Sequence, residues 1–284
     1  MAGASMKDIK SRIKSVQSTM QITKAMELVA SSKLRRAKER QERLRPYHEE
    51  LRRALNEIES STNDFSSVYQ QKREIHKTCM IVIAGDRGLA GGYNSNVFKL
   101  ATSLTEGGEP FCVLPIGKRA LEFFRRRGHE ILTDEFQEAA VISVSDCFLM
   151  SRLITEGFAS GQFDRVTLVY TKLHSLLSQT PDTMELLPLT ATKREEKAEV
   201  RELILYEPSP DAVYNAIVPS YIAGMLFSAM CESVASELAA RRTAMDAASK
   251  NAAEMIEDLS LRYNRARQGA ITQEITEIVA GAEH

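Results

Sequence analysis

The sequence predicts an α/β protein in which a long antiparallel two-helix coiled coil, made by the N- and C-terminal segments, joins a central Rossmann-like α/β domain. Apolar residues recur in heptads along both ends of the chain, glycine is absent from residue 9 to residue 58, and the middle alternates strand-like with helix-like runs. We therefore divide the chain into an N-terminal coiled-coil helix (1–60), a central α/β domain with linkers (61–210), and a C-terminal coiled-coil helix with a protruding tip (211–284).

The N-terminal helix is predicted from one seam of residues. Alternating steps of four and three residues run from Ile9 to Ile58, and eleven of the fifteen positions are apolar, which is typical of a coiled coil. Pro46 removes one backbone donor, so a local kink is expected there. The seam consists of Ile9, Ile13, Val16, Met20, Thr23, Glu27, Ala30, Leu34, Ala37, Gln41, Leu44, His48, Leu51, Leu55 and Ile58.

The C-terminal helix is expected from about Asp211 to Ala280, and it should pair with the first helix. Residues 1–60 hold 14 Lys/Arg against 8 Asp/Glu, whereas residues 211–284 hold 6 against 10, so the ends attract each other. If residues 60 and 211 both meet the central domain, the numbers of paired positions sum to about 271. The predicted seam is Val234, Leu238, Met245, Ala248, Ala252, Met255 and Leu259.

Two sets of apolar residues have no predicted partner within the chain. The register places Asp8 opposite Tyr263, so the C-terminal helix continues beyond the end of the first helix. A lone amphipathic helix is marginal in water, so another protein should cover its apolar stripe. The stripe is Ile271, Ile275, Ile278 and Val279, and a second set on the first helix lies partly off the seam at Ile22, Met26, Leu28 and Val29.

The central segment should form a mixed sheet. Strand-like runs occur at 78–84, 110–116, 165–171, 184–190 and 203–207, and helix-like runs at 96–106, 118–127 and 145–160. The first strands alternate with helices, as parallel strands require, while the last two follow without a helix and suggest an antiparallel edge. Residues 60–75 and 191–200 are polar enough to be linkers or loops.

The stretch "GDRGLAGGYNSN" (85–96) raises the question of nucleotide binding, because it follows a strand and precedes a helix. It fits neither G-x-G-x-x-G nor the P-loop, whose lysine and hydroxyl are missing. The second strand ends in "PIGKR" and lacks the acidic residue of a dinucleotide site, and Asp86 would repel a phosphate. A tight strand-to-helix turn is the favoured interpretation, and no cofactor is expected.

Other sites are weakly indicated. The cysteines lie far apart in sequence without a C-x-x-C pair, which favours buried thiols in a reducing compartment, and the histidines lack partners at metal-ligand spacing. No apolar run approaches the roughly 18 residues of a membrane span, so direct membrane insertion is not expected. The cysteines are Cys79, Cys112, Cys147 and Cys231, and the histidines are His48, His76, His129, His174 and His284.

The basic run 33–45 could contact nucleic-acid phosphates, but it has no aromatic residue on which bases could stack. We therefore interpret the run as a solvated helix face and expect no nucleic-acid partner. A nucleotide-binding enzyme and a coiled-coil nucleic-acid protein remain the two alternatives.

Four motifs resemble signature segments of the gamma subunit of F-type rotary ATP synthases of the bacterial type. They are residues 8–37, beginning "DIKSRIKSVQ", residues 241–282, beginning "RRTAMDAASK", "GDRGLAGGYNSN" and "YEPSP" (206–210). The resemblance implies a non-catalytic rotor shaft inside a ring of alpha and beta subunits. It implies an α/β foot on the c-subunit ring, which also binds the epsilon subunit. Such a shaft would couple proton or sodium flow to ATP synthesis or hydrolysis, as a peripheral protein on the cytoplasmic face of the cell membrane.

The resemblance also implies roles for individual residues. The plastid members' dithiol switch has no counterpart here, so thiol control is not expected. Beta-subunit catch loops would meet Lys24, Arg241, Arg242, Arg267 and Gln268. An acidic lever loop of those subunits would face Lys33, Arg35, Arg36, Lys38, Arg40 and Arg43. An apolar sleeve would hold Ile271, Ile275, Ile278 and Val279, and polar loops of the c ring would meet Tyr206 and Glu207.

Overall fold

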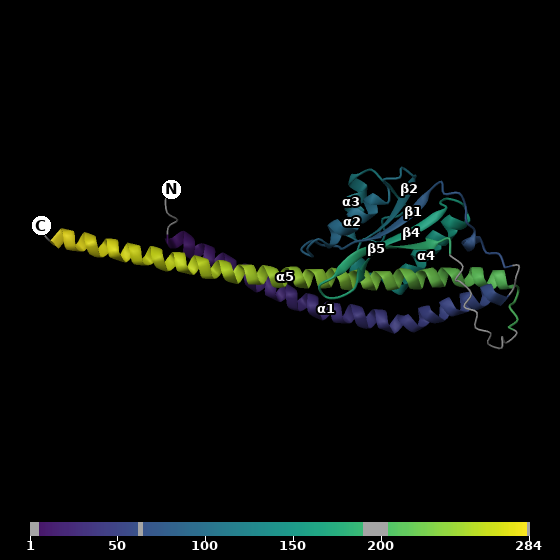
Figure 1. Cartoon of the computed structure of the whole chain (residues 1–284), viewed down its shortest axis with the longest axis horizontal. Coiled ribbons are helices and arrows are strands. Elements are labelled where there is room, and N and C mark those ends of the chain that lie inside the picture. Colours follow the sequence, from purple (N-terminus) through teal and green to yellow (C-terminus); the bar gives the residue numbers. More distant parts are fainter. Residues whose placement is uncertain (1–5, 62–64, 190–203, 283–284) are drawn as a thin grey trace. The chain divides into compact units, whose positions relative to one another are not determined.

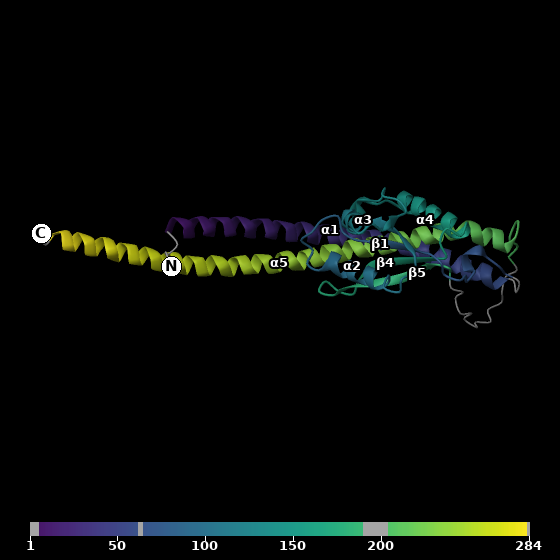
Figure 2. The same cartoon turned by 90° about the horizontal axis from the view of Figure 1, so that it is seen from above.

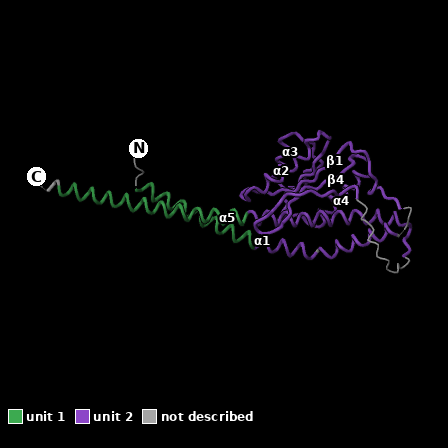
Figure 3. Tube along the Cα trace, viewed as in Figure 1, with its two compact units in different colours: residues 1–31, 241–284 green, residues 32–240 purple. Residues whose placement is uncertain are grey.

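The computed structural model describes residues 6–61, 65–189 and 204–282, which belong to two compact units. One unit joins the start of the chain to its end, residues 1–31 with 241–284, and the other spans residues 32–240 (Figure 3). Two continuous helices, α1 (Met6–Ser61) and α5 (Pro210–Ala282), each contribute to both units (Figures 1 and 2). Both predicted terminal helices are therefore confirmed.

The heptad seam of α1 is confirmed. Every seam position whose side chain is described is buried or half-buried. Pro46 and Pro219 lie inside α1 and α5, and neither ends its helix. The heptad pattern thus identified the buried face of α1 along its length.

The two helices pair antiparallel within the terminal unit, and one hydrogen bond gives the register. The Thr23 and Ser249 hydroxyls are 2.7 Å apart, so the residue numbers sum to 272, one more than predicted. The seam on α5 is shifted accordingly: Met255 is 57% exposed, whereas Ile256 is half-buried. The assignment of Met255 to the seam was wrong, because a straight helix drifts from a strict heptad repeat.

The larger unit contains a five-stranded sheet in the order β3-β2-β1-β4-β5. Strands β1, β2, β3 and β4 are parallel, and β5 runs antiparallel to β4. The strands are β1 (Thr78–Ile83), β2 (Phe111–Ile116), β3 (Glu130–Ile131), β4 (Arg165–Leu173) and β5 (Gln179–Leu187). This order confirms the Rossmann-like interpretation and the antiparallel edge.

Helices cover both faces of this sheet (Figure 1). On one face, α2 (Tyr93–Ser103) and α3 (Lys118–Arg126) form a small apolar layer with alternate residues of β1 such as Val82. On the other face, α4 (Val144–Ala159) and the parts of α1 and α5 within this unit form the main core, where Ile81 of β1 lies. Short 3₁₀ turns occur at Val68–Gln70 and Ala139–Val141. The part of α5 that lies within this unit therefore shares one core with the sheet.

Three sequence predictions for this unit need correction. The strand expected at 203–207 is absent from residues 204–207, where Leu205 is 84% exposed. The strand expected at 184–190 begins earlier, at Gln179, and the two-residue strand β3 was missed. The predicted linker 60–75 begins inside α1 and contains a 3₁₀ turn, and 191–200 lies outside the described residues.

The composition of α5 also differs from expectation. This helix contains an 18-residue window with a mean hydropathy of 1.4, long and apolar enough by composition to cross a membrane. Half of that window is buried within the protein, and α5 residues such as Val218, Ile222 and Leu226 are fully buried in the main core. The expectation that no segment reaches this composition was wrong, and core burial accounts for these apolar residues.

The four cysteines are free and buried, as predicted, but folding brings them together in pairs. Cys79 and Cys112 face each other on β1 and β2, and their thiols interact. Burial raises the pKa of Cys147 to about 12 and that of Cys231 to about 11, and the two thiols are close enough to interact. Distance along the sequence was therefore a poor guide to distance between these thiols.

Candidate functional site

The glycine-rich segment between β1 and α2 forms the predicted tight turn, and it holds a carboxylate of its own. Asp86 accepts hydrogen bonds from the backbone N–H of Ala139 (2.9 Å), Ala140 (3.3 Å) and Lys118 (3.4 Å). Lys118 begins α3, and the start of a helix is a favourable place for an anion. The position that a phosphate would take at this N-terminus is occupied by Asp86.

The same turn lies against α5. Asn94 accepts a hydrogen bond from the Gly85 N–H at 2.8 Å and donates one to the Arg87 carbonyl at 3.2 Å, which fixes the shape of the turn. A Cβ atom on Gly85 would lie only 2.7 Å from Oε1 of Glu237 on α5. Glycine at position 85 therefore allows the backbone and this carboxylate to approach without a shift of the Glu237 side chain.

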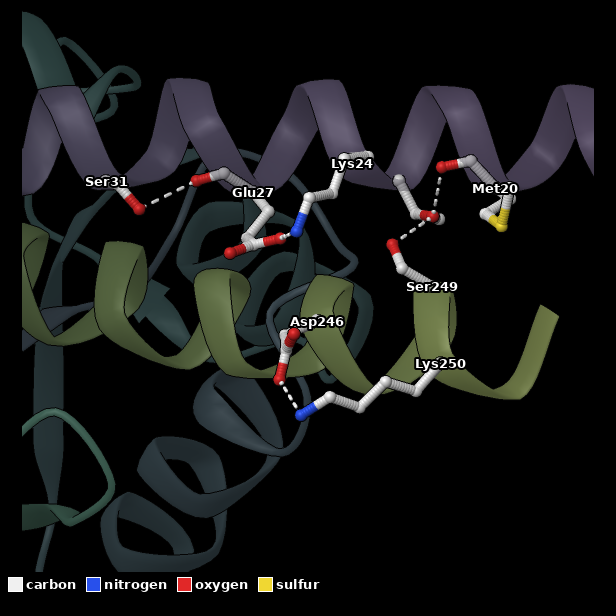
Figure 4. Close-up of polar contacts among 8 residues, drawn as sticks. Met20, Lys24, Glu27, Ser31, Asp246, Ser249 and Lys250 are labelled. Carbon is white, nitrogen blue, oxygen red and sulfur yellow. Dashed lines mark hydrogen bonds and ion pairs between the residues drawn. The ribbon is translucent and has the colours of Figure 1, made fainter. Parts of the chain in front are cut away.

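In the terminal unit, charged residues gather beside the hydroxyl pair (Figure 4). Lys24 forms an ion pair with Glu27 at 2.9 Å on α1, and Lys250 forms one with Asp246 at 2.8 Å on α5. Asp246 has a lowered pKa, first because Lys250 donates to it and also because Lys24 and Arg242 are nearby. Charges of both helices therefore form one mixed polar surface.

The five predicted catch residues separate into two groups. Lys24, Arg241 and Arg242 lie near the Thr23–Ser249 level of the pair, and the two arginines are half-buried. Arg267 and Gln268 are exposed and lie 25 or more residues further along α5, about 37 Å away at 1.5 Å per residue. No single loop of ordinary size spans both groups.

The basic face belongs to the larger unit and is mostly exposed. Arg35 pairs with Glu39 at 3.7 Å and stays open to solvent. Arg40 differs, because its guanidinium donates to the Ile142 carbonyl at 3.0 Å and lies 4.7 Å from the Phe227 ring centre. These contacts fix the guanidinium of Arg40, although the residue as a whole is exposed. All six predicted members of the basic face are exposed: Lys33, Arg35, Arg36, Lys38, Arg40 and Arg43.

The apolar residues predicted to lack a partner are exposed. In the last turns of α5 the exposed fraction rises from 47% at Ile271 to 71% at Ile278. On α1, Ile22, Leu28 and Val29 are all more than half exposed. Ile275 and Val279 are also exposed, whereas Met26 is half-buried. Both apolar sets are thus available to other proteins.

Tyr206 and Glu207 lie just before α5. Tyr206 is half-buried and packs against the main core, whereas Glu207 is exposed and borders a shallow depression of about 280 Å³ with Leu51 and Ile217. The side chain of Glu207 is thus more accessible to solvent than that of Tyr206.

A groove between α1, α4 and α5 was not anticipated from the sequence. It encloses about 610 Å³ and is bordered by Arg52 and His48 of α1, Phe148 of α4 and Phe227 of α5. Nε2 of His48 is buried without a hydrogen-bond partner in the described part of the chain, and burial, followed by the charge of Arg52, lowers the pKa of His48. The signal for a buried histidine was present, because His48 occupies a seam position.

Within 6–61, 65–189 and 204–282, no group of three or more His, Cys, Asp or Glu side chains is arranged to hold a metal ion.

Solved structures resemble this fold. A chain of the Euglena gracilis mitochondrial ATP synthase (OSCP/F1/c-ring) aligns with a TM-score of 0.64 at 19% identity, covering 98% of this chain and 93% of that one. A chain of the Tetrahymena thermophila mitochondrial ATP synthase central stalk and c ring aligns with a TM-score of 0.57 at 24% identity, covering 80% and 99%. At these identities the likeness supports the fold.

Sequence relatives are much closer. A family model described as ATP synthase matches residues 5–284. The ATP synthase gamma chain of Ruminococcus albus is 48% identical over 279 residues, covering 97% of this chain and 96% of the relative. The sodium-ion-specific ATP synthase gamma chain of Acetobacterium woodii is 42% identical over 293 residues, covering 97% of each. This chain therefore belongs to the ATP synthase gamma-chain family.

Proposed function

We propose that this gamma chain, a non-catalytic subunit of the ATP synthase central stalk, is a rotating shaft. In this proposal it couples ion flow through the c ring to ATP synthesis or hydrolysis on the beta subunits. Residues 1–60 and 211–284 form the shaft, and residues 61–210 form the foot. It has no active site of its own and associates peripherally with the cell membrane, on the cytoplasmic face.

The observation that carries this proposal is the exposed apolar stripe at the end of α5. Ile271, Ile275, Ile278 and Val279 are about half exposed or more. Burying such side chains contributes roughly 1.5–3 kcal/mol each, so a protein sleeve gains from enclosing them. We infer that the alpha and beta ring supplies this sleeve, where an apolar tip can turn without a directional contact.

Asymmetry supplies the mechanism of coupling. Two helices lack threefold symmetry, so at any angle the shaft meets three beta subunits with different surfaces. Each beta subunit is then held in a different state of nucleotide binding, and rotation exchanges these states. The split of the catch residues suggests two levels of contact, Lys24 with Arg241 and Arg242, and Arg267 with Gln268.

Contacts that break on every turn must be weak. Exposed ion pairs contribute about 0–1 kcal/mol, which suits the basic face Lys33, Arg35, Arg36, Lys38 and Arg43 against an acidic lever loop. Arg40 belongs to the same exposed face, and its guanidinium also donates a hydrogen bond to the Ile142 carbonyl of the foot. At the other end, Glu207, with Tyr206 behind it, would meet the polar loops of the c ring. The foot would also bind the epsilon subunit.

Charge reversal tests the basic face. Arg35→Glu with Arg36→Glu, in the complete membrane-bound complex, should lower ion-driven ATP synthesis because repulsion replaces attraction at the lever loop. Lys99→Glu with Arg126→Glu makes the same charge change at exposed sites on α2 and α3 and should leave synthesis unchanged. Equal synthesis by both variants and the parent would contradict a torque role for this face.

Reconstitution tests the assignment as a whole. The chain should co-purify with alpha and beta subunits and permit ATP-driven ion pumping in vesicles. The two alternatives predict ATP or NAD binding to the purified chain, or salt-sensitive binding to DNA or RNA. Either result, combined with failure to assemble, would overturn the rotor proposal.

A further inference from the structure

One face of α5 carries four polar residues toward the carboxyl-terminal ends of the central strands. The four residues are Glu232, Ser233, Ser236 and Glu237. Glu232 and Ser236 are four residues apart, and so are Ser233 and Glu237, so the four side chains share one face of the helix. Both serines are 0% exposed and Glu237 is 7% exposed. Buried polar groups are costly unless they are bonded, so their partners reveal why they are there.

The serines bond to a backbone position that the sheet leaves incomplete. Thr171 donates its N–H to Ser233 Oγ at 3.1 Å, and Ser236 Oγ donates to the Thr171 carbonyl at 3.1 Å. Thr171 lies two residues beyond Val169, the last β4 residue paired with β1, so β1 provides no partner for its N–H and carbonyl. The two hydroxyls therefore complete the bonding of Thr171 in place of a neighbouring strand.

The two glutamates extend this contact on both sides. Glu232 Oε1 accepts the N–H of Leu173, the last residue of β4, at 3.2 Å. The Glu237 carboxylate lies against Gly85, in the space that any other side chain at position 85 would need. Burial, followed by the negative charge of Glu237, raises the pKa of the neighbouring Tyr93. α5 is thus bonded to the end of β4 and packed against the turn after β1.

We propose that Glu232, Ser233, Ser236 and Glu237 form a polar clamp that transmits torque between the foot and α5. This inference rests on the proposed rotor function. Apolar attraction in the core is non-directional. Hydrogen bonds have a required distance and angle, so the three bonds from Glu232, Ser233 and Ser236 along one helix face help to fix both the rotation and the axial position of α5.

The clamp also gives the glycine turn a mechanical role. Asn94 holds the turn in shape, and Gly85 lets it reach the Glu237 carboxylate. Clamp residues are positioning residues: they touch no nucleotide, and they act on coupling through the attachment of the helix.

Two variants that each remove a buried hydroxyl test the clamp. Ser236→Ala removes the hydroxyl bonded to the Thr171 carbonyl, and the control Thr155→Val removes a hydroxyl bonded to the Ser151 carbonyl of the same helix, α4. Ser236 is 0% exposed and Thr155 is 2% exposed, so both changes should lower stability. Only the first removes a bond between α5 and the sheet. Ser233→Ala serves as a second clamp variant that removes a different bond.

Two activities of the assembled complex separate torque from folding. Detached complexes that hydrolyse ATP place no load on the foot, whereas ion pumping by the vesicle-bound complex does. The ratio of pumping to hydrolysis should fall in Ser236→Ala and Ser233→Ala and stay at the parent value in Thr155→Val. Hydrogen exchange at the Thr171 amide should be about 2- to 13-fold faster in Ser233→Ala, the effect of one lost buried hydrogen bond.

Each outcome bears on a definite statement. An unchanged ratio in both clamp variants, or an equal fall in Thr155→Val, would overturn the clamp. If one clamp variant fails to assemble, the other decides, because each removes a single bond. Failure of the parent complex to pump ions would contradict the proposed rotor function instead.

Discussion

Replacing the buried hydroxyl pair of the terminal unit should reveal how strongly one polar contact holds the register of the two helices. Thr23 and Ser249 are each 8% exposed, and their oxygens are 2.7 Å apart. Thr23 has a second partner, the Met20 carbonyl at 3.0 Å, whereas Ser249 bonds only to Thr23 in the described part of the chain. The two single variants are therefore not equivalent.

Ser249→Ala leaves Thr23 bonded to Met20, so it should cost about 0.5–1.5 kcal/mol, the net contribution of one hydrogen bond. Thr23→Val leaves the Ser249 hydroxyl buried without its partner, which costs about 1–3 kcal/mol. Removing both oxygens leaves an apolar contact, so the double variant should be less destabilised than the sum of the singles.

Native-state hydrogen exchange of the full chain, measured on peptides from 16–30 and 242–256, reports the local opening of the helix pair directly. Ser249→Ala should accelerate exchange about 2- to 13-fold, and Thr23→Val should accelerate it more. Ser18→Ala, which removes an exposed hydroxyl bonded to the Lys14 carbonyl, is the matched control and should change little. Additive effects, or a larger effect of Ser249→Ala, would refute this reasoning.

Three further predictions concern folding. Burial lowers the pKa of His48, so the free energy of unfolding should fall as the pH drops below about 6.5, by at most about 1.4 kcal/mol per pH unit. Urea unfolding at pH 7.5 and 5.5 should show a smaller loss in His48→Phe than in the parent protein. An equal pH dependence of the two proteins would contradict this prediction. Ile256→Ser should accelerate exchange in the terminal unit, whereas Met255→Ser should not, and the reverse order would restore the heptad assignment. Gly117→Ala should prevent cooperative thermal unfolding of the α/β domain, measured by circular dichroism. Gly117 has a φ of 93°, and the Cβ of an alanine there would overlap the Ala84 carbonyl. A melting curve like that of the parent protein would disprove this prediction.

The sequence predicted features that depend on repetition. The seam of α1 was identified at every described position because a buried helix face recurs over many turns. The hydrophobic strands β1, β2 and β4 were likewise clear, since each is a run of six or more residues. On α5, small residues such as Ala248 and Ala252 make the apolar face less distinct, which allowed Met255 to be confused with Ile256.

Features that depend on tertiary contacts could not be predicted in this way. Strand β3 has two residues, too few for any pattern, and Leu205 is apolar yet exposed. Arg40 belongs to a basic run by sequence, but its guanidinium is fixed by a carbonyl 102 residues away. The clamp serines looked like ordinary small residues of a helix, because their significance depends on the missing bonds of Thr171. Which residues meet other subunits stays a prediction.

The turn that holds Asp86 has a consequence for cell physiology. A site at this edge of the sheet that took its negative charge from ATP would fill and empty as the energy supply of the cell rises and falls. Here the side chain of Asp86 supplies the negative charge, and it accepts hydrogen bonds from the backbone N–H groups of Lys118, Ala139 and Ala140. Under the rotor proposal, the charge that holds this turn is therefore present at any ATP concentration in the cell.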